Sequence, residues 1–224
     1  MSYKYKHPRP SVTTDILVFS IRNKRLQILL VQRGIEPFKD QWAIPGGFLK
    51  MDEDLSTCAA RELREETGVT DLASLPLTQF HTYGAVNRDP RGRTISVAFF
   101  TLVPSDQLTV RGTSDARDAR WFPLDDLPIL AFDHSRIVED GRANLARLVD
   151  PEIVDSAKVV FDLLPATFSL SEAQTVFEIL RGEKLDKRNF RKWFSGTWTL
   201  QETGETTRGP GRPALLYRLV HKTA

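Results

Sequence analysis

A chain of 224 residues is long enough for one large domain or for two smaller ones, so length alone excludes neither arrangement. A hydrophobic content of 41% and a charged content of 27% lie near the globular average, which excludes a disordered or fibrous architecture. The net charge of +2 is unevenly spread: from Arg181 onward ten basic side chains face four acidic ones, which leaves the remainder of the chain negative. Such a split favours a separate C-terminal module that faces a polyanion over an ordinary solvated surface.

The first ten residues are basic and polar, and no apolar stretch long enough for a signal peptide or a membrane helix follows them. We therefore expect a cytoplasmic protein with no membrane partner. The single cysteine, Cys58, cannot form an internal disulfide, and no group of Cys and His has the spacing of zinc ligands. We expect Cys58 to be a buried and inert thiol.

The first elements follow from runs of apolar residues. The runs Ile16–Ile21 and Leu26–Val31 predict two strands joined by a tight turn. Pro45–Gly47 predicts a turn that breaks the next strand. Leu55–Thr67 has helical spacing, and Gly68 is the type of residue that ends a helix.

Strand and turn signals continue up to residue 148. Leu77–Tyr83 and Thr94–Val103 predict strands, with a turn at Asp89–Gly92 between them. Trp121-Phe122 predicts the end of another strand, and Ser135–Leu148 predicts a helix. This mixture indicates an α+β domain, which we place at residues 1–150.

After Pro151 the pattern changes to short helices followed by strands. The helices are predicted at Glu152–Leu164, Ser171–Arg181 and Asp186–Phe194, with N-cap residues before the last two. Two strands, Thr197–Gln201 and Ala214–Val220, enclose a loop rich in Gly, Pro and Arg. The order of helices, hairpin and loop predicts a winged helix-turn-helix domain at residues 151–224.

Three carboxylates lie on one face of the helix predicted at Leu55–Thr67. Glu62, Glu65 and Glu66 are spaced i, i+3 and i+4, so they repel one another unless cations lie between them. Such oxygen ligands suit Mg²⁺ or Mn²⁺, and a diphosphate can complete the coordination. The alternative is an ordinary acidic helix that faces solvent.

The full spacing of this segment resembles the Nudix box. The residues that match its pattern are Gly47, Glu53, Arg61, Glu62, Leu63, Glu65, Glu66, Gly68 and Val69. The resemblance implies an α/β/α sandwich in which Glu62 and Glu66 bind the metal and Glu65 contributes a ligand or a hydrogen bond. It further implies that Arg61 orients the glutamates and that Glu53 supports the loop.

The chemistry that the resemblance implies is attack of a metal-activated water on a diphosphate. The backbone at Gly46 and Gly47 has no side chain in the way, so it can approach a metal or a phosphate closely. Members of this family often place the general base outside the box. Asp115 and Asp118 are candidates for it, and surface aspartates are the alternative reading of each.

The segment Thr82–Arg93 carries the candidate ligand-binding residues. Arg88, Arg91 and Arg93 can bind phosphates, and Tyr83 can stack on an adenine, whereas a charged hairpin is the alternative. Together with Trp121–Pro123 and Ala131–His134, the segment resembles ADP-ribose-binding Nudix proteins. ADP-ribose is therefore the expected ligand, and His134 is a further candidate for the pocket.

The helix predicted at Asp186–Phe194 combines a basic face with the apolar Phe190, Trp193 and Phe194. The apolar side predicts packing, and the basic side predicts entry into the major groove of DNA. The loop after it forms the expected wing. The expected DNA-binding residues are Lys187, Arg188, Asn189, Arg191, Lys192, Arg208 and Arg212.

Across its whole length the chain resembles the NrtR family, the Nudix-related transcriptional regulators of NAD metabolism. Asp186–Arg191, Gly211–Ala214 and Leu216–Arg218 carry the C-terminal part of this resemblance. It implies a repressor, working as a homodimer, in which a Nudix domain senses ADP-ribose and a winged helix binds double-stranded operator DNA.

Many regulators of this family lack glutamates of the box, whereas Glu62, Glu65 and Glu66 are all present here. Hydrolysis of ADP-ribose to AMP and ribose 5-phosphate therefore stays open beside regulation. The alternative to a regulator is an ADP-ribose pyrophosphatase whose C-terminal extension serves dimerisation.

Overall fold

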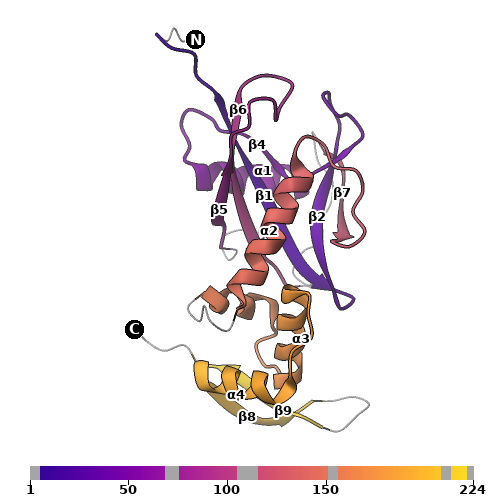
Figure 1. Cartoon of the computed structure of the whole chain (residues 1–224), viewed down its shortest axis with the longest axis vertical. Coiled ribbons are helices and arrows are strands. Elements are labelled where there is room, and N and C mark those ends of the chain that lie inside the picture. Colours follow the sequence, from indigo (N-terminus) through magenta and orange to yellow (C-terminus); the bar gives the residue numbers. More distant parts are fainter. Residues whose placement is uncertain (1–5, 69–75, 105–115, 151–155, 208–212, 221–224) are drawn as a thin grey trace.

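The computed structural model describes residues 6–68, 76–104, 116–150, 156–207 and 213–220. Its larger part is a seven-stranded mixed sheet in the order β3-β2-β1-β6-β5, with β4 paired to β1 and β7 paired to β2 (Figure 1). β1 and β6 run parallel, and the other pairs are antiparallel. The strands are β1 (Ser11–Arg22), β2 (Arg25–Arg33), β3 (Trp42–Ala43), β4 (Gly46–Phe48), β5 (Thr78–Tyr83), β6 (Thr94–Leu102) and β7 (Ala116–Pro123).

The tight turn predicted between the first two strands is confirmed. Asn23 and Lys24 have φ angles of 53° and 59°, the left-handed values that a two-residue hairpin turn requires. The strand predictions at Leu77–Tyr83 and Thr94–Val103 are confirmed to within one residue at their ends.

One helix covers each face of the sheet. Alternate residues of β1 point to opposite faces, so Ile16 and Val18 pack with the helix α1 (Leu55–Thr67) and Leu17 and Phe19 pack with α2 (His134–Leu148). The chain therefore forms the three-layered α/β/α sandwich that the sequence predicted.

The helix α1 has the predicted bounds. The Asp54 carboxylate caps its start by accepting a hydrogen bond from the Thr57 backbone N–H. Gly68 ends it with a φ of 70°, and the Gly68 N–H donates to the Arg64 carbonyl. Cys58 is a buried free thiol, as expected, and burial raises its pKa.

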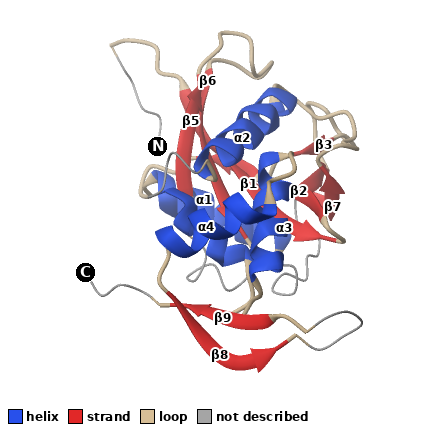
Figure 2. Ribbon diagram, turned by 60° about the horizontal axis from the view of Figure 1, so that its bottom comes forward, coloured by secondary structure: helices blue, strands red, loops and turns tan. Residues whose placement is uncertain are grey.

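The C-terminal elements form a winged helix-turn-helix. They are the 3₁₀ helix η1 (Ser156–Leu163), α3 (Leu170–Arg181), α4 (Lys187–Thr197) and the hairpin of β8 (Leu200–Thr206) with β9 (Leu215–Leu219). Figure 2 shows this hairpin projecting beside the helices, as a wing does. Aromatic rings fill the core of this part. They include Phe161 of η1, Phe177 of α3, Phe194 of α4 and Trp198, the residue after α4.

Three sequence predictions in this part need correction. Instead of an α-helix over Glu152–Leu164, the described residues form a 3₁₀ helix from Ser156 to Leu163, a short run with two β-branched residues that ends close to Pro165. The helix predicted to end at Phe194 continues to Thr197, because the Trp198 N–H bonds the Phe194 carbonyl and the indole packs on Phe161.

Because α4 is longer than predicted, the first strand of the hairpin also differs from its predicted position. The first begins at Leu200, not Thr197, and runs on to Thr206, so the wing loop is shorter than the sequence indicated. The second spans Leu215–Leu219, within the predicted range.

The two parts of the chain share one apolar core. Leu145 and Val149, at the end of α2, belong to the same buried cluster as Val176 and Leu180 of α3. Helix α2 packs directly against α3, and η1 packs against β6. Because packed interiors resist independent movement, a displacement of α2 has a direct path to the C-terminal helices.

Close packing between α2 and the sheet depends on Gly141. A Cβ at this position would lie 2.1 Å from Cδ1 of Leu17, which is fully buried and therefore has no free space to move into. We expect Gly141→Ala to lower the free energy of unfolding by about 1–3 kcal/mol, the usual cost of overpacking. Thermal unfolding followed by circular dichroism measures this.

Gly196→Ala is the matched control, because nothing lies within 4 Å of its Cβ position on the exposed side of α4. There the added methyl group should raise stability by roughly 0.5–1 kcal/mol through helix propensity. Equal effects of the two substitutions would contradict the packing described for α2.

Candidate functional site

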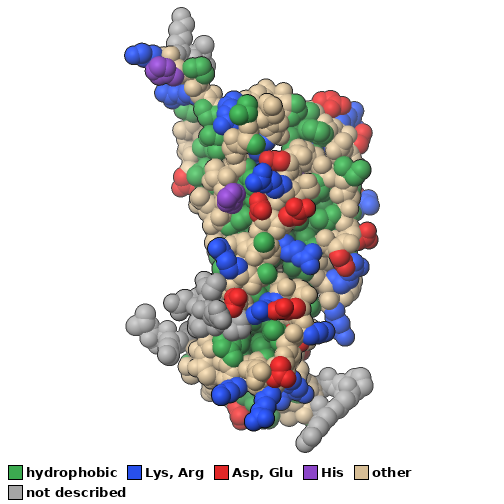
Figure 3. All heavy atoms as spheres, in the orientation of Figure 1, with side chains coloured by type: hydrophobic (Ala, Val, Ile, Leu, Met, Phe, Trp, Pro, Cys, Tyr) green, Lys and Arg blue, Asp and Glu red, His purple; other side chains and the backbone are tan. Residues whose placement is uncertain are grey.

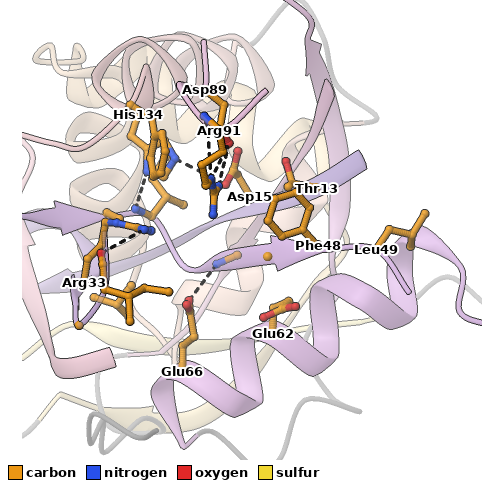
Figure 4. Close-up of a pocket in the computed structure, with 18 of the residues that line it drawn as sticks. Thr13, Asp15, Arg33, Phe48, Leu49, Glu62, Glu66, Asp89, Arg91 and His134 are labelled. Carbon is orange, nitrogen blue, oxygen red and sulfur yellow. Dashed lines mark hydrogen bonds and ion pairs between the residues drawn. The ribbon is translucent and has the colours of Figure 1, made fainter. Parts of the chain in front are cut away.

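A pocket of about 370 Å³ opens where β4 passes over α1 (Figure 4). Carboxylates line one side of it, and arginine and aromatic side chains line the other. The lining includes Asp15, Arg33, Gly46, Gly47, Phe48, Glu62, Glu66, Arg88, Asp89, Arg91, Phe132 and His134.

Glu62 and Glu66 of α1 both point toward β4. One oxygen of Glu66 accepts a hydrogen bond of 2.9 Å from the Gly46 backbone N–H. A Cβ on Gly47 would lie 2.4 Å from the Glu62 carboxyl carbon, so only glycine leaves room for this carboxylate beneath the strand. The turn predicted at Pro45–Gly47 is only a bend at Pro45, because Gly46 and Gly47 pair with β1 as part of β4. This short strand brings backbone and carboxylates together, and Figure 4 shows both side chains in the cavity.

The surroundings of both carboxylates disfavour their charged form and raise their pKa values. Burial, with Glu62 and Asp15 nearby, raises the pKa of Glu66 to about 8 although the Gly46 N–H lowers it. Burial also raises the pKa of Glu62, against the opposing effect of Arg61. A bound cation would relieve both shifts.

Arg61 holds the neighbouring acidic groups. Its guanidinium donates to both oxygens of Glu53 at 2.6 and 2.9 Å, to Glu62 at 2.6 Å and to Glu65 at 3.1 Å. The hydrogen bonds from Arg61 lower the pKa of Glu53 to about 2. Arg61 also donates to the Phe48 carbonyl, so it connects Glu53, in the loop before α1, to β4.

Glu65 is not brought into the pocket. Its side chain is 50% exposed and turns toward Arg61. Among the described residues, no three His, Cys, Asp or Glu side chains form a group that could hold a metal by themselves. Two carboxylates, Glu62 and Glu66, still fit Mg²⁺ or Mn²⁺, since Mg²⁺ commonly takes one or two carboxylates and completes its coordination with water and phosphate.

The opposite wall joins arginines to aromatic rings. The Arg91 guanidinium lies 4.8 Å from the ring centre of Phe48 and 5.3 Å from that of Phe132, and Arg33 lies 4.8 Å from Phe132. Asp89 pairs with Arg91 at 2.7 Å. Burial lowers the pKa of Arg33, and the positive charge of the nearby Arg91 adds to this effect.

A buried polar cluster closes the pocket behind these residues. Arg88 donates to both carboxylate oxygens of Asp133 at 3.0 and 2.7 Å and to Asp15 at 3.4 Å. The His134 Nδ1 accepts a hydrogen bond of 2.9 Å from the Ile44 N–H, and its Nε2 lies 3.7 Å from Asp15. Burial lowers the pKa of His134, so the ring is neutral with its proton on Nε2.

Several predicted site residues lie elsewhere. Tyr83 is buried and donates to Asp140 of α2, so it does not face the cavity. Arg93 donates to the Ala85 carbonyl and is not part of the pocket lining. Asp118 lies on β7, pairs with Arg120 and does not reach the cavity. Asp115 and Val69 lie outside the described residues.

Among the pocket residues that were not singled out as site residues from the sequence are Asp15, Arg33, Phe48 and Asp89, while Phe132 was included only as part of the segment Ala131–His134. Of these, only Asp15 stands out in the sequence, because it is a charged residue directly before the apolar run Ile16–Phe19 of the same strand. Phe48 follows the two glycines of the predicted turn, and Arg33 ends a strand. Their roles depend on contacts between distant segments, which no local pattern encodes.

The C-terminal part presents a second candidate surface. Phe190 and Phe194 of α4 are buried, while Lys187, Arg188, Asn189, Arg191 and Lys192 are exposed. None of these four cations forms an ion pair within the described part of the chain. Figure 3 shows Lys and Arg side chains gathered at this end of the molecule.

A hollow of about 380 Å³ lies beside this surface, between the start of α3, α4 and β9. Lys187 and Arg191 both line it. Arg208 and Arg212, the predicted wing residues, lie outside the described residues. The geometry is that of a basic helix exposed beside a wing, the arrangement by which winged helices approach DNA.

Comparisons with known proteins agree with both surfaces. Residues 12–141 match the NUDIX domain, and residues 160–219 match the NrtR DNA-binding winged helix domain. A protein of Acinetobacter baylyi described as an ADPR responsive transcriptional repressor NtrR is 35% identical over 219 residues, covering 96% of this chain and 84% of that protein. The chain belongs to the NrtR family.

Other comparisons extend this result. The structure of Shewanella oneidensis NrtR complexed with a 27mer DNA matches this NrtR-family chain with a TM-score of 0.75 and 31% identity, over 93% of each chain. The NUDIX domain of the same protein complexed with ADP ribose matches with a TM-score of 0.57 and 33% identity, over 64% of this chain and 94% of that one.

A Methanocaldococcus jannaschii ADP-ribose pyrophosphatase is 38% identical over 138 residues, covering 61% of this chain and 76% of that protein. The similarity of this NrtR-family chain to Nudix hydrolases implies a dependence on divalent metal ions, without identifying the ion. In the described residues, no helix is both long and apolar enough to cross a membrane.

Proposed function

We propose that the chain is an ADP-ribose-responsive transcriptional repressor of genes for NAD biosynthesis or a related pathway, acting as a homodimer in the cytoplasm. One observation carries the proposal: the same chain contains both the pocket with Glu62 and Glu66 and a basic winged helix. Its similarity to a repressor of this type extends over 96% of the chain. We place the boundary between ligand-binding and DNA-binding domains near residue 150.

The pocket suits ADP-ribose on chemical grounds. Glu62 and Glu66, the second of which accepts a hydrogen bond from the Gly46 N–H, are the groups that would hold Mg²⁺ or Mn²⁺ beside the diphosphate. Bound metal neutralises phosphate charge and lowers the pKa of coordinated water. Arg33 and Arg91 supply positive charge, and Phe48 and Phe132, which also line the pocket, are rings of the kind that stack on a flat base.

The second surface suits double-stranded DNA. With Phe190 and Phe194 anchored in the core, the exposed Arg188, Asn189 and Arg191 are available to base edges or phosphates. In a dimer, two such helices would meet half-sites about one turn of DNA apart.

Two observations favour a second function, the hydrolysis of ADP-ribose to AMP and ribose 5-phosphate. Glu62 and Glu66 are both present and both face the cavity, and the chain resembles the pyrophosphatase over its Nudix domain. In such an enzyme the signal would be destroyed by its own sensor.

Electrophoretic mobility shift on the protein's own upstream DNA, with and without ADP-ribose and Mg²⁺, tests both functions. A specific shift that ADP-ribose relieves supports the repressor, and AMP formed in the same tubes adds the hydrolase. Absence of any preference for promoter DNA over random DNA removes the basis for a repressor. Rapid AMP release without a specific shift would instead favour a hydrolase whose C-terminal part serves dimerisation.

A further inference from the structure

Helix α2 is attached at one end to the ligand pocket and at the other to the DNA-binding helices. Its first turn lies beside the cavity, where His134 is part of the lining. Its last residues share a buried cluster with α3, and the Arg142 guanidinium lies 3.5 Å from the Cβ position of Gly182, the residue that ends α3. Figure 1 shows α2 running along the sheet toward α3.

The start of α2 is held in an unusual way. Asp133 is its N-cap residue, yet the Asp133 carboxylate makes no capping hydrogen bond to the helix. Both of its oxygens instead accept from Arg88, which is 4% exposed and lines the pocket. The usual local stabilisation of a helix start is therefore replaced by an ion pair to the pocket wall.

Arg88 is shared between partners that belong to different elements. Its Nη2 atom reaches both Asp133, before α2, and Asp15 in the middle of β1. Asp15 also accepts from the Ser96 hydroxyl of β6. Because Arg88 lines the pocket, a phosphate or ribose oxygen bound there would be a further acceptor for this guanidinium and would compete with the pair that holds α2.

We propose that the Arg88–Asp133 ion pair couples occupancy of the pocket to the position of α2, and through α2 to the DNA-binding helices. The proposal rests on the proposed function, because it assigns a route to the response that function requires. Asp133 itself does not line the cavity, so it acts as a positioning residue and not as a ligand-binding one. For this coupling, the ligand must bind with different affinity to the two positions of α2, because only a difference in affinity shifts the equilibrium between them.

The test compares Asp133→Asn with wild type in the full-length chain. Asparagine keeps the size and the capping ability of the residue but loses the charge that pairs with Arg88. Fluorescence anisotropy gives the operator Kd with and without saturating ADP-ribose, and calorimetry gives the Kd for ADP-ribose alone. The ratio of the two operator values is the coupling factor, which is typically about 5–150 in allosteric proteins.

We expect the coupling factor of Asp133→Asn to fall at least about fivefold, toward one, while the Kd for each ligand alone stays within about threefold of wild type. The matched control is Asp140→Asn, also on α2, whose carboxylate binds Tyr83 outside the pocket. It should keep the wild-type coupling factor. Asp133→Ser, which retains capping, serves as a second variant if thermal unfolding shows that the first is damaged.

Each other outcome decides against the inference. Full coupling in Asp133→Asn removes the role of the ion pair while leaving the repressor function intact. Loss of ADP-ribose binding beyond about tenfold would make Asp133 part of the ligand site instead. A wild-type chain that binds both ligands with a coupling factor of one overturns the regulatory function itself, and this inference with it.

Discussion

Replacing Arg188 and Arg191 together with alanine is expected to weaken operator binding by about 100-fold at moderate salt. Both side chains are exposed on α4, whose opposite face is fixed by the buried Phe190 and Phe194, so their loss should leave the fold unchanged. Each arginine contact to a base or phosphate contributes roughly 1–3 kcal/mol. Fluorescence anisotropy on labelled operator, across a series of salt concentrations, measures the loss.

The salt series separates the two kinds of contact. If both arginines bind phosphates, the slope of log K against log salt should fall by about two, and operator and random DNA should weaken alike. If one reads a base edge, the preference for operator should shrink instead.

A control must remove the same charge elsewhere. The double variant Lys24→Ala with Arg64→Ala takes two exposed cations from the hairpin turn and from α1, and it should bind operator within about threefold of wild type. Equal losses in the two double variants would mean that net charge, not the α4 surface, governs binding. An unaffected Arg188 and Arg191 variant would exclude α4 as the recognition helix.

Local patterns predicted the elements well where they are self-contained. The helix at Leu55–Thr67 was predicted to the residue because its apolar face and its terminal glycine lie within one short segment. The α3 helix begins with a capping box at Ser169 and Glu172, which is also local. Where tertiary packing decided the outcome, as for Thr197 and the 3₁₀ helix at Ser156–Leu163, prediction from sequence was wrong.

The pocket illustrates the same limit. Spacing placed Glu62, Glu65 and Glu66 on one helix face, but it could not show that Arg61 draws Glu65 outward while Gly47 leaves room for Glu62. Arg88 lines the pocket, as its predicted role in phosphate binding requires, but its ion pairs with Asp133 and Asp15 were not predicted. A charged side chain in a sequence does not reveal which buried partner it meets, because that partner lies 45 or 73 residues away.

Glu66→Gln is expected to lower the affinity for Mg²⁺ or Mn²⁺ by at least about 100-fold, because it removes one of the two carboxylates that face the cavity. In wild type, metal binding must expel the proton that the raised pKa of about 8 keeps on Glu66. Metal affinity should therefore rise about tenfold per pH unit from pH 6 to pH 8. Calorimetry in two buffers of different ionisation enthalpy measures both the affinity and the released proton.

The same shift predicts how metal-free stability depends on pH. The pKa of Glu66 is raised from 4.5 to about 8 on folding, so the folded state keeps a proton that the unfolded state has released. This stabilising contribution is fully present below pH 4.5 and is lost as the pH rises toward 8, by roughly 2–5 kcal/mol at about 1.4 kcal/mol per unit. Glu66→Gln should lack this decline, and saturating Mg²⁺ should reverse it in wild type.

Glu65→Gln is the matched control, since Glu65 carries the same charge on the same helix but is half exposed and turned toward Arg61. It should keep the metal affinity within about threefold and retain the pH dependence of wild type. If Glu65→Gln costs as much metal affinity as Glu66→Gln, three carboxylates share the metal, and binding must turn Glu65 away from Arg61 into the cavity. If neither variant changes metal binding, the carboxylates beneath β4 do not form the metal site.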